Sequence, residues 1–451
     1  MSSRKTKMAE MPMPRLVLDM GFPLMFSLLI QSLYNIVDSI YVSRVSEKAL
    51  TATSLAFPVQ HLMIAISVGL SVGLNAVMAR SAGSGNNKRA GNVATEGLVI
   101  ALGISLVFAV LSLLLTQRVS AGMTDDPETA AMTASYMGIC VLFSQGIFVE
   151  KVAQRTLTAV GLSRWSMYSQ LTAAISNIIL DPVLIFGMFG LPALGITGAV
   201  IATVAGQWLG AVIAVWANIR FNTQIRFSFR DLHFEHEDLQ DVLRIGMPTM
   251  ITQSLGSLMT ALVNGILITF SSTAVAFFGV YYRLQNFVYM PVNGLGQAVL
   301  PIAAFSYGAC NKARLKELWN VGIRYAVLFT LAGILIFELF PAPLLKLFNA
   351  SEEMLAIGVP ALRIIAVIFP FAAFTYISGY YSSGLGNAMV NLIGGMLRQV
   401  VVLVPLVWIF ANFFGMHTVW YAFWIAELSA CLYCYLCVKR EKARKVEILP
   451  E

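Results

Sequence analysis

The sequence predicts an all-α membrane protein with about twelve transmembrane helices in two six-helix halves. Three observations support this fold class. Apolar residues make up 58% of the 451 residues and charged residues only 12%, about half the roughly 25% typical of soluble proteins. Apolar runs of roughly 20 residues, the length that crosses a bilayer, recur along the chain. The two halves also share sequence patterns at a constant separation.

The apolar runs divide into twelve candidate spans. In order, they cover residues 17–43, 52–79, 93–116, 131–157, 163–189, 194–218, 243–270, 275–308, 320–341, 356–382, 387–413 and 416–438. Prolines inside or at the ends of these runs predict kinks; they are Pro58, Pro248, Pro291, Pro370 and Pro405. No apolar core followed by a small-residue cleavage site precedes the first run, so we expect that run to be retained as a span.

The net charge of +7 matters less than where the basic residues lie. The connections after odd-numbered spans contain only Arg44, Lys48, Arg118 and Lys346, whereas most other Lys and Arg residues lie in the termini and the even-numbered connections. Because basic loops stay on the cytoplasmic side, we expect both termini to be cytoplasmic. This predicts a tail at 1–15, an N-lobe at 16–219, a cytoplasmic linker at 220–241, a C-lobe at 242–438 and a second tail at 439–451.

Two clusters of metal-binding residue types are better explained without a metal. His233 and His236 lie in the charged linker, and Cys431, Cys434 and Cys437 are spaced by three on the last apolar helix. Structural zinc sites usually take ligands from loops and separate elements. We therefore interpret the histidines as solvated linker residues and the cysteines as helix packing.

The two halves match at an offset of 225 residues, without gaps. The pattern GFPLMFSLLIQSL from Gly21 resembles GMPTMITQSLGSL from Gly246. The same offset pairs Gly69 with Gly294, Gly83 with Gly308, Asn86 with Asn311, Arg89 with Arg314 and Gly161 with Gly386. Such a duplication is typical of transporters whose substrate lies between two bundles. Since six spans is an even number, both copies have the same orientation.

Polar residues present in one copy alone are the stronger functional candidates. Asp38 lies in an apolar helix, on one stripe with Gln31, Tyr34 and Asn35. A carboxylate within a membrane span must face a bundle interior or a watery cavity, and is a functional-site candidate by default. Its partner at the offset is Val263.

Two more first-half residues, Asn177 and Asp181, pair with Val402 and Leu406. The rise along each helix places Asp38, Asp181 and Thr203 in one layer, on the outer side of the membrane midpoint. Pro182 frees the carbonyl of Ile178. Together these oxygens suit a hard cation such as Na⁺, and they suit a proton equally well.

Structural explanations stand beside these functional ones. Asn177 and Thr203 are residue types that often serve only as hydrogen-bonding contacts between helices. Gln31, Tyr34 and Tyr136 either pack or line a substrate chamber. The apolar runs of the second half contain three arginines, Arg283, Arg363 and Arg398. We expect their side chains to bond backbone carbonyls or to extend to the membrane interface. The alternative is that they contact an anionic headgroup or the other bundle.

These residues resemble the multidrug and toxic compound extrusion (MATE) family, in particular the branch similar to the DNA-damage-inducible F proteins. The resemblance spans nearly the whole chain and rests on the twelve spans, the offset halves, the helix-one pattern ending at Asp38, the Asn177 to Asp181–Pro182 pattern, and GAVIAT ending at Thr203. It implies export of organic cations in exchange for H⁺ or Na⁺. It also implies a cation site at Asp38, Asn177, Asp181 and Thr203, and a substrate chamber lined by Gln31, Tyr34 and Tyr136. We add Asn35 to the expected substrate contacts because it lies on the same helix stripe.

The branch similar to norfloxacin exporters carries a helix-seven glutamate where this chain has Gly256, which argues against a second-lobe cation site. We expect a monomer in a prokaryotic cell membrane, with membrane lipids and small organic cations as partners, no nucleic acid, and no cofactor other than the coupling ion. A lipid-linked oligosaccharide flippase is the nearest alternative. A membrane-embedded enzyme is a more distant one, because the spans contain only His61 and His417 and no HExxH motif.

Overall fold

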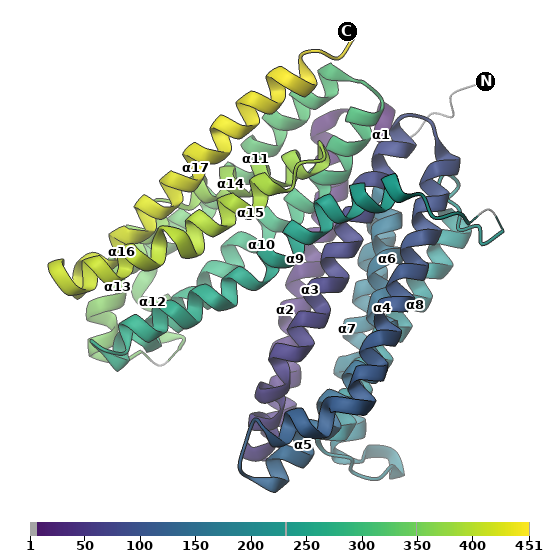
Figure 1. Cartoon of the computed structure of the whole chain (residues 1–451). Coiled ribbons are helices and arrows are strands. Elements are labelled where there is room, and N and C mark those ends of the chain that lie inside the picture. The colour runs from purple at the N-terminus through teal and green to yellow at the C-terminus, as the bar shows by residue number, and fades with distance from the viewer. Residues whose placement is uncertain (1–6, 231, 349, 451) are drawn as a thin grey trace. The chain divides into compact units, whose positions relative to one another are not determined.

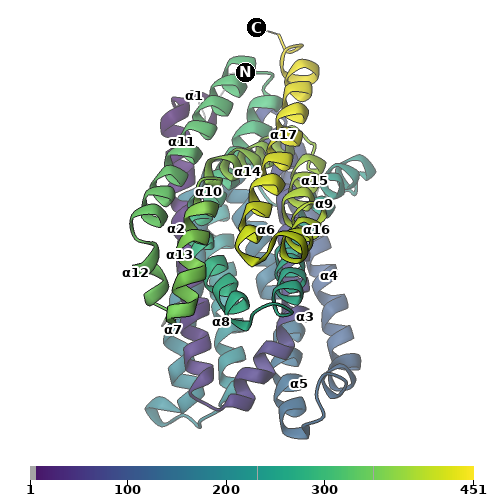
Figure 2. The ribbon, with the colours of Figure 1, turned by 90° about the vertical axis from the view of Figure 1, so that its left-hand side faces the viewer.

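A computed structural model describes residues 7–230, 232–348 and 350–450. In this part of the chain all regular structure is helical, as Figures 1 and 2 show. Arg4 and Lys5 of the predicted N-terminal tail, and residue 231 of the predicted linker, lie outside the described residues.

The helices of the first half precede residue 222 and those of the second half follow it. The first half contains α1 Lys7–Glu10, α2 Met13–Ser43, α3 Glu47–Gly83, α4 Asn87–Ala121, α5 Pro127–Leu142, α6 Gln145–Ala159, α7 Ser163–Phe186, η1 Met188–Gly190 and α8 Ile196–Phe221. The second half contains α9 His236–Leu267, α10 Ser272–Gly308, α11 Lys312–Leu339, α12 Pro341–Lys346, α13 Glu352–Ala366, α14 Phe369–Gly384, α15 Met389–Met396, η2 Leu397–Val401, α16 Leu403–Ile409, η3 Phe410–Phe414, η4 Met416–Tyr421, α17 Ala422–Glu441 and η5 Lys442–Val446.

The described residues contain ten helical segments that are long and apolar enough to cross a membrane, or twelve if each of two bent pairs counts as one span. This confirms the predicted all-α membrane fold. The bent pairs are α5 with α6, at 43°, and α13 with α14, at 51°. Pro370, one of the expected kink positions, lies in the first turn of α14 and accounts for the second bend, because proline cannot continue the hydrogen bonding of a preceding helix.

The chain forms two compact units. We call Phe26–Gly246 the N-unit, and Met1–Met25 together with Met247–Glu451 the C-unit. The division falls within α2 and within α9, so the first turns of each of these helices group with the unit of the other half. The predicted boundaries of lobes, linker and tails stay a prediction.

Glycines at positions that repeat with the offset allow close helix packing in both units. In the N-unit, a Cβ at Gly246 would lie 2.9 Å from the carbonyl oxygen of Gly69. In the C-unit, a Cβ at Gly294 would lie 2.6 Å from the backbone of Met25. In each unit the missing side chain therefore lets two helix backbones meet.

Helix starts repeat with the same offset. The hydroxyl oxygens of Ser46 and Ser271 accept from the backbone N–H three residues on, at 3.0 and 3.2 Å. Asn86 and Asn311 do the same for α4 and α11, both at 3.0 Å. Such caps satisfy amides that have no partner in the first helical turn. Local backbone structure is thus duplicated along with the apolar pattern.

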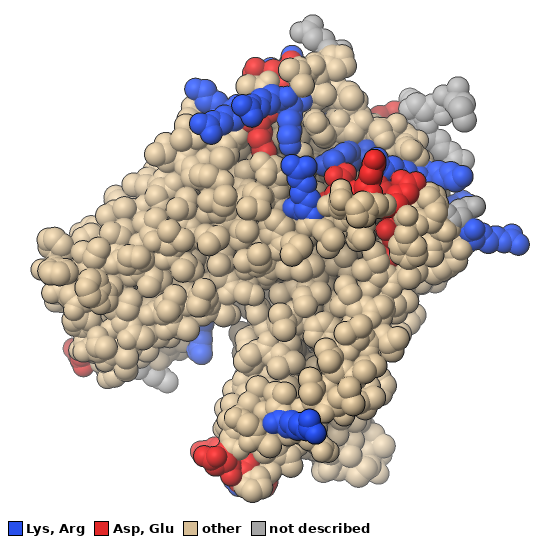
Figure 3. All heavy atoms as spheres, viewed as in Figure 1, with Lys and Arg blue, Asp and Glu red and all other residues tan. Residues whose placement is uncertain are grey.

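Charged side chains lie mainly at helix ends. On the face shown in Figure 3, each unit presents a broad surface without charged residues along its helices, and blue and red atoms gather toward the ends. Exposed large apolar side chains populate the surface between them, such as Leu106, Leu113 and Ile219. A surface of this kind suits hydrocarbon rather than water.

Candidate functional site

Small residues on α8 position the site. Gly198, Ala202, Gly206 and Gly210 are spaced by four residues and therefore lie on one face of the helix. A Cβ at Gly206 would lie 2.7 Å from the carbonyl oxygen of Ala173, and one at Gly198 would lie 2.5 Å from that of Leu184. Small residues at this spacing let membrane helices approach closely. Thr203 is consequently held against α7.

Asn177 connects the two helices. Its side-chain nitrogen lies 3.3 Å from Oδ1 of Asp181 and 3.3 Å from Oγ1 of Thr203. When the amide is turned over, its oxygen accepts from Thr203 N at 3.2 Å and its nitrogen donates to Asp181 Oδ2 at 3.2 Å. Both orientations bring Asn177, Asp181 and Thr203 together as the sequence predicts, and all three are buried.

Asp38 on α2 completes the group. The ring of Tyr41, one turn further along α2, packs edge-on against Phe186 of α7 with centroids 6.3 Å apart. The carboxyl groups of Asp38 and Asp181 lie close enough to each other to interact directly. In the described part of the chain, Oδ1 of Asp38 is buried without a hydrogen-bond partner. The predicted juxtaposition of the two acids is therefore present in the structure.

The predicted chamber residues differ in position. The hydroxyls of Tyr34 and Tyr136 lie within electrostatic range of both Asp38 and Asp181, and Tyr136 is only 4% exposed. Gln31 is half-buried and Asn35 is exposed on α2. The structure thus groups the two tyrosines with the acids, whereas Asn35 is exposed.

No basic side chain balances the two acids. Among the described residues, neither Asp38 nor Asp181 forms an ion pair with Lys, Arg or His, and the charged group that acts on each is the other carboxyl. No cluster of three or more His, Cys, Asp and Glu side chains that could hold a metal occurs among these residues either. The oxygen donors present at the site are two carboxyls, one amide and one hydroxyl, a set that suits a proton or an alkali cation.

A second polar cluster in the N-unit was not predicted. Glu150 on α6 is 2% exposed, and its Oε1 accepts from Gln154 Nε2 at 2.8 Å. Lys151 lies 3.9 Å from Glu150 and donates to Gln170 on α7 at 3.1 Å. The signal that could have predicted this cluster is an acid next to a base within an apolar run.

The C-unit contains a buried ion pair between Arg398 and Glu427. The pair corrects the prediction made for Arg398, and Glu427 was not predicted as a functional residue. Arg398 neither extends to an interface nor bonds a backbone carbonyl: its Nη1 lies 3.9 Å from Oε2 of Glu427, and its Nη2 donates to Tyr376 OH at 2.6 Å. Glu427 is not named in the sequence analysis, although its offset partner is Ala202 and Glu427 is therefore also a polar residue present in one copy alone. The second half thus does hold a buried carboxylate.

The two other arginines are on the surface. Arg363 Nε lies 3.8 Å from Glu338 Oε2, with the two side chains 54% and 37% exposed. Arg283 is exposed on α10. Neither belongs to a buried site.

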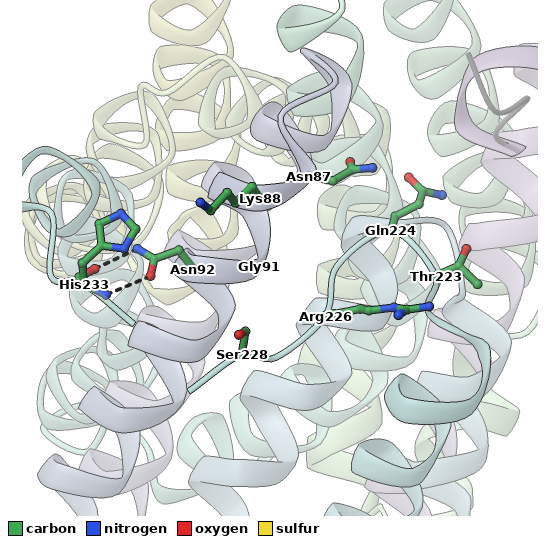
Figure 4. Close-up of a pocket in the computed structure, with 9 residues that line it drawn as sticks. All are labelled: Asn87, Lys88, Gly91, Asn92, Thr223, Gln224, Arg226, Ser228 and His233. Carbon is green, nitrogen blue, oxygen red and sulfur yellow. Dashed lines mark hydrogen bonds between the residues drawn. The ribbon is translucent and has the colours of Figure 1, made fainter. Parts of the chain in front are cut away.

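A pocket of about 380 Å³ lies in the N-unit between the start of α4 and the segment that follows α8. Figure 4 shows this segment crossing α4, with paired hydrogen bonds between Asn92 and the backbone of His233 at 2.8 and 3.2 Å. Lys88 and Arg226 extend away from each other in this view. Lys88 and Arg226 therefore do not point at one position where a ligand could bind both.

Comparison with known sequences decides the family. The sequence profile of the MatE family matches residues 23–183 and 248–409. The chain belongs to the MatE family. Each matched segment covers most of one half, in agreement with the duplication, and the resemblance found in the sequence is confirmed at family level. The finer assignment to the DNA-damage-inducible F branch stays a prediction.

Curated relatives of this MATE protein are named as exporters and transporters. The chain is 29% identical over 344 residues to the "Probable multidrug resistance protein YoeA" of Bacillus subtilis, covering 74% of this chain and 73% of that protein. It is 23% identical to the "Multidrug export protein MepA" of Staphylococcus haemolyticus, at 90% and 89% coverage. It is also 23% identical to a "FAD transporter" of Shewanella oneidensis, at 95% coverage of each.

Solved structures share the fold. An outward-facing multidrug resistance MATE family transporter superimposes with a TM-score of 0.91 at 24% identity, covering 99% of this chain and 100% of that one. Family, relatives and fold together identify the chain as a multi-pass membrane transporter of small molecules.

Proposed function

We propose that this MATE protein is a secondary antiporter that exports amphiphilic organic cations in exchange for H⁺ or Na⁺ by alternating access. Asp38, Asn177, Asp181 and Thr203 hold the coupling ion. Gln31, Tyr34, Asn35 and Tyr136 contact the substrate. The proposal also places the protein as a monomer in a prokaryotic plasma membrane with both termini in the cytoplasm.

The observation that carries the proposal is the contact between the carboxyls of Asp38 and Asp181. Asp181 is buried and Asp38 is half-buried, and two neighbouring carboxyl groups in such a place cannot both be ionised without strong repulsion. Since no basic side chain among the described residues balances them, a proton shared between them or a bound cation must do so. The site therefore has a physical need for the ion that an antiporter takes up.

Coupling follows from unequal binding. If the ion binds one arrangement of the protein more tightly than the other, its gradient shifts the population between them. Each elementary charge that crosses the membrane field contributes about 2.3 kcal/mol per 100 mV. Binding of the ion beside Tyr34 and Tyr136 would place it next to the predicted substrate contacts, so that ion and drug compete for neighbouring groups.

The test is ethidium transport by the purified protein in liposomes, under a proton gradient alone and a sodium gradient alone. Asp38→Asn keeps the shape of the side chain and removes its charge. We expect the variant to lose uphill ethidium transport under whichever gradient drives the wild type. The matched control is Asp125→Asn, the same chemical change at an exposed loop residue, which should transport normally.

Wild-type rates in Asp38→Asn under both gradients would remove Asp38 from the mechanism. Uphill ethidium transport by the wild type with neither gradient would reject antiport itself. Under the proton gradient alone, activity assigns H⁺ as the coupling ion; under the sodium gradient alone, it assigns Na⁺.

Cationic substrates are proposed over lipid-linked sugars because acids dominate the N-unit site. A flippase for pyrophosphate-linked lipids needs several arginines in its chamber, yet Arg283 and Arg363 are on the surface and Arg398 is balanced by Glu427.

A further inference from the structure

The ion pair of the C-unit is assembled by three helices. Arg398 lies on η2, a one-turn π-helix between α15 and α16, and single π turns of this kind are frequent at functional sites. Glu427 lies on α17 and Tyr376 on α14. The side chains of Arg398 and Glu427 are 11% and 5% exposed. Two opposite charges are thus held in the interior of one unit.

Close packing of α15 brings Arg398 to this place. A Cβ at Gly394 would lie 2.9 Å from Sγ of Cys434 on α17. Gly394 precedes Arg398 by four residues, so both lie on one face of the chain. The absence of a side chain at Gly394 therefore lets the turn that carries Arg398 approach α17, on which Glu427 lies two turns before Cys434.

The surroundings of the guanidinium are those of an organic-cation site. Its Cζ lies 4.1 Å from the ring centroid of Tyr376 and 5.9 Å from that of Tyr289. Aromatic faces at such distances attract cations. Glu427 supplies the opposite charge. Aromatic rings with one carboxylate are the groups that recognise guanidinium and alkylammonium ligands.

The pair is loosely joined. The 3.9 Å between Arg398 Nη1 and Glu427 Oε2 is too long for a hydrogen bond. Within the described residues, Arg398 Nη1, Gln399 Oε1 and Glu427 Oε1 are buried without hydrogen-bond partners. These residues line a cavity of about 50 Å³, which is room for a few water molecules. The guanidinium therefore occupies a site larger than itself and can be exchanged without rebuilding a tight ion pair.

We propose that the C-unit contains an organic-cation site, formed by Glu427, Tyr289 and Tyr376, whose resident cation is the chain's own Arg398. Removal of that side chain opens the site to a free guanidinium or small alkylammonium ion. The N-unit lacks this arrangement, because the offset partners of Arg398 and Glu427 are Ala173 and Ala202. In the C-unit the carboxylate of Glu427 is thus balanced by a side chain of the protein itself. In the N-unit the acids Asp38 and Asp181 are balanced by a mobile ion.

The test of the site is ligand binding, which does not depend on the proposed transport function. Arg398→Ala, purified in detergent, is heated with and without 20 mM methylguanidinium, at matched ionic strength with NaCl. We expect the ion to raise the melting temperature of Arg398→Ala by about 2 °C or more and to leave the wild type unchanged. Adding Glu427→Gln to the Arg398→Ala variant should abolish the rise.

Equal shifts in the wild type and Arg398→Ala would overturn the proposal, as would a shift that survives the loss of Glu427. If Arg398→Ala does not fold, the same measurement on Arg398→Gln replaces it, with the same expectation.

Discussion

Gly206 of α8 lies against Ala173 of α7, with space for a hydrogen atom but none for a methyl group. A Cβ at this position would lie 2.7 Å from the carbonyl oxygen of Ala173 and 3.5 Å from Cβ of Asn177. Gly206→Ala should therefore push α8 away from α7, at a cost of about 1–3 kcal/mol for overpacking. It should also separate Thr203 from Asn177. Thermal unfolding of the purified protein and the ion dependence of ethidium transport measure the two effects.

Gly103→Ala is the matched control, because a Cβ there would meet nothing within 4 Å. Equal melting temperatures for the two variants would contradict close packing of α7 and α8 as the cause.

Thr203 contributes one hydroxyl to the proposed ion site. Thr203→Val keeps the shape and removes the oxygen that lies 3.3 Å from Asn177 Nδ2. We expect the apparent affinity for the coupling ion to fall about fivefold, which corresponds to one hydrogen bond of about 1 kcal/mol. The measurement is the transport rate as a function of H⁺ or Na⁺ concentration. Thr330→Val is the control, since its buried hydroxyl donates to carbonyls of its own helix; a similar loss there would argue against a ligand role for Thr203.

The sequence predicts the fold well because the membrane imposes length and polarity on each helix. Apolar runs and the constant offset identify the spans and the duplication, and the paired glycines and caps repeat in the structure. The contact between Asp38 and Asp181 is also predictable. Each acid is costly in a membrane, and their depth along their helices places them in one layer.

What the sequence does not show is which faces of the helices meet. Asn35 shares the stripe of Asp38 by helical spacing, yet it is exposed on α2. Arg398 looks like an isolated arginine until α17 is placed beside α15, because Glu427 lies 29 residues away in the chain. Pairings of this kind depend on close approaches such as that of Gly394 to Cys434, which no single-helix pattern reveals.

The stability of the first turn of α5 depends on pH through Asp126. It caps α5, and its Oδ2 accepts from Thr129 N at 3.2 Å and from Thr129 Oγ1 at 2.6 Å. The Thr129 hydrogen bonds and, next, Lys48 lower the pKa of Asp126 from 3.8 to about 2. A depressed pKa means that its stabilisation is complete above the ordinary pKa and is lost as the pH falls through about 2.

Asp126→Ala should therefore lower the melting temperature by a constant amount between pH 5 and pH 8. The difference from the wild type should shrink as the pH falls through about 4 toward 2. Asp125→Ala, at the exposed neighbouring position, should show no such dependence. A difference that widens on acidification would contradict the charge-dependent cap.

Arg89 and its offset partner Arg314 each hold the chain near the start of the first long helix of a half, α9 for Arg89 and α2 for Arg314. They do so with different partners. In the N-unit, Arg89 Nε and Nη2 donate to Oδ1 of Asp238 on α9, at 2.8 and 2.5 Å. In the C-unit, Arg314 Nη2 donates to the carbonyls of Met8 and Met11, at 2.8 and 3.1 Å. Asp238 is fully buried, so Arg89→Leu leaves its carboxylate buried without its arginine. Arg314→Leu instead leaves neutral carbonyls without their donor.

We therefore expect Arg89→Leu to destabilise the protein by about 1–3 kcal/mol, below the 3–5 kcal/mol of a fully buried pair because Arg89 itself is partly exposed. Arg314→Leu should cost less. Replacing both Arg89 and Asp238 with leucine should recover much of the loss, because no charge is then left buried. The melting temperatures of the single and double variants form a double-mutant cycle. Additive losses would mean that the pair does not anchor α9.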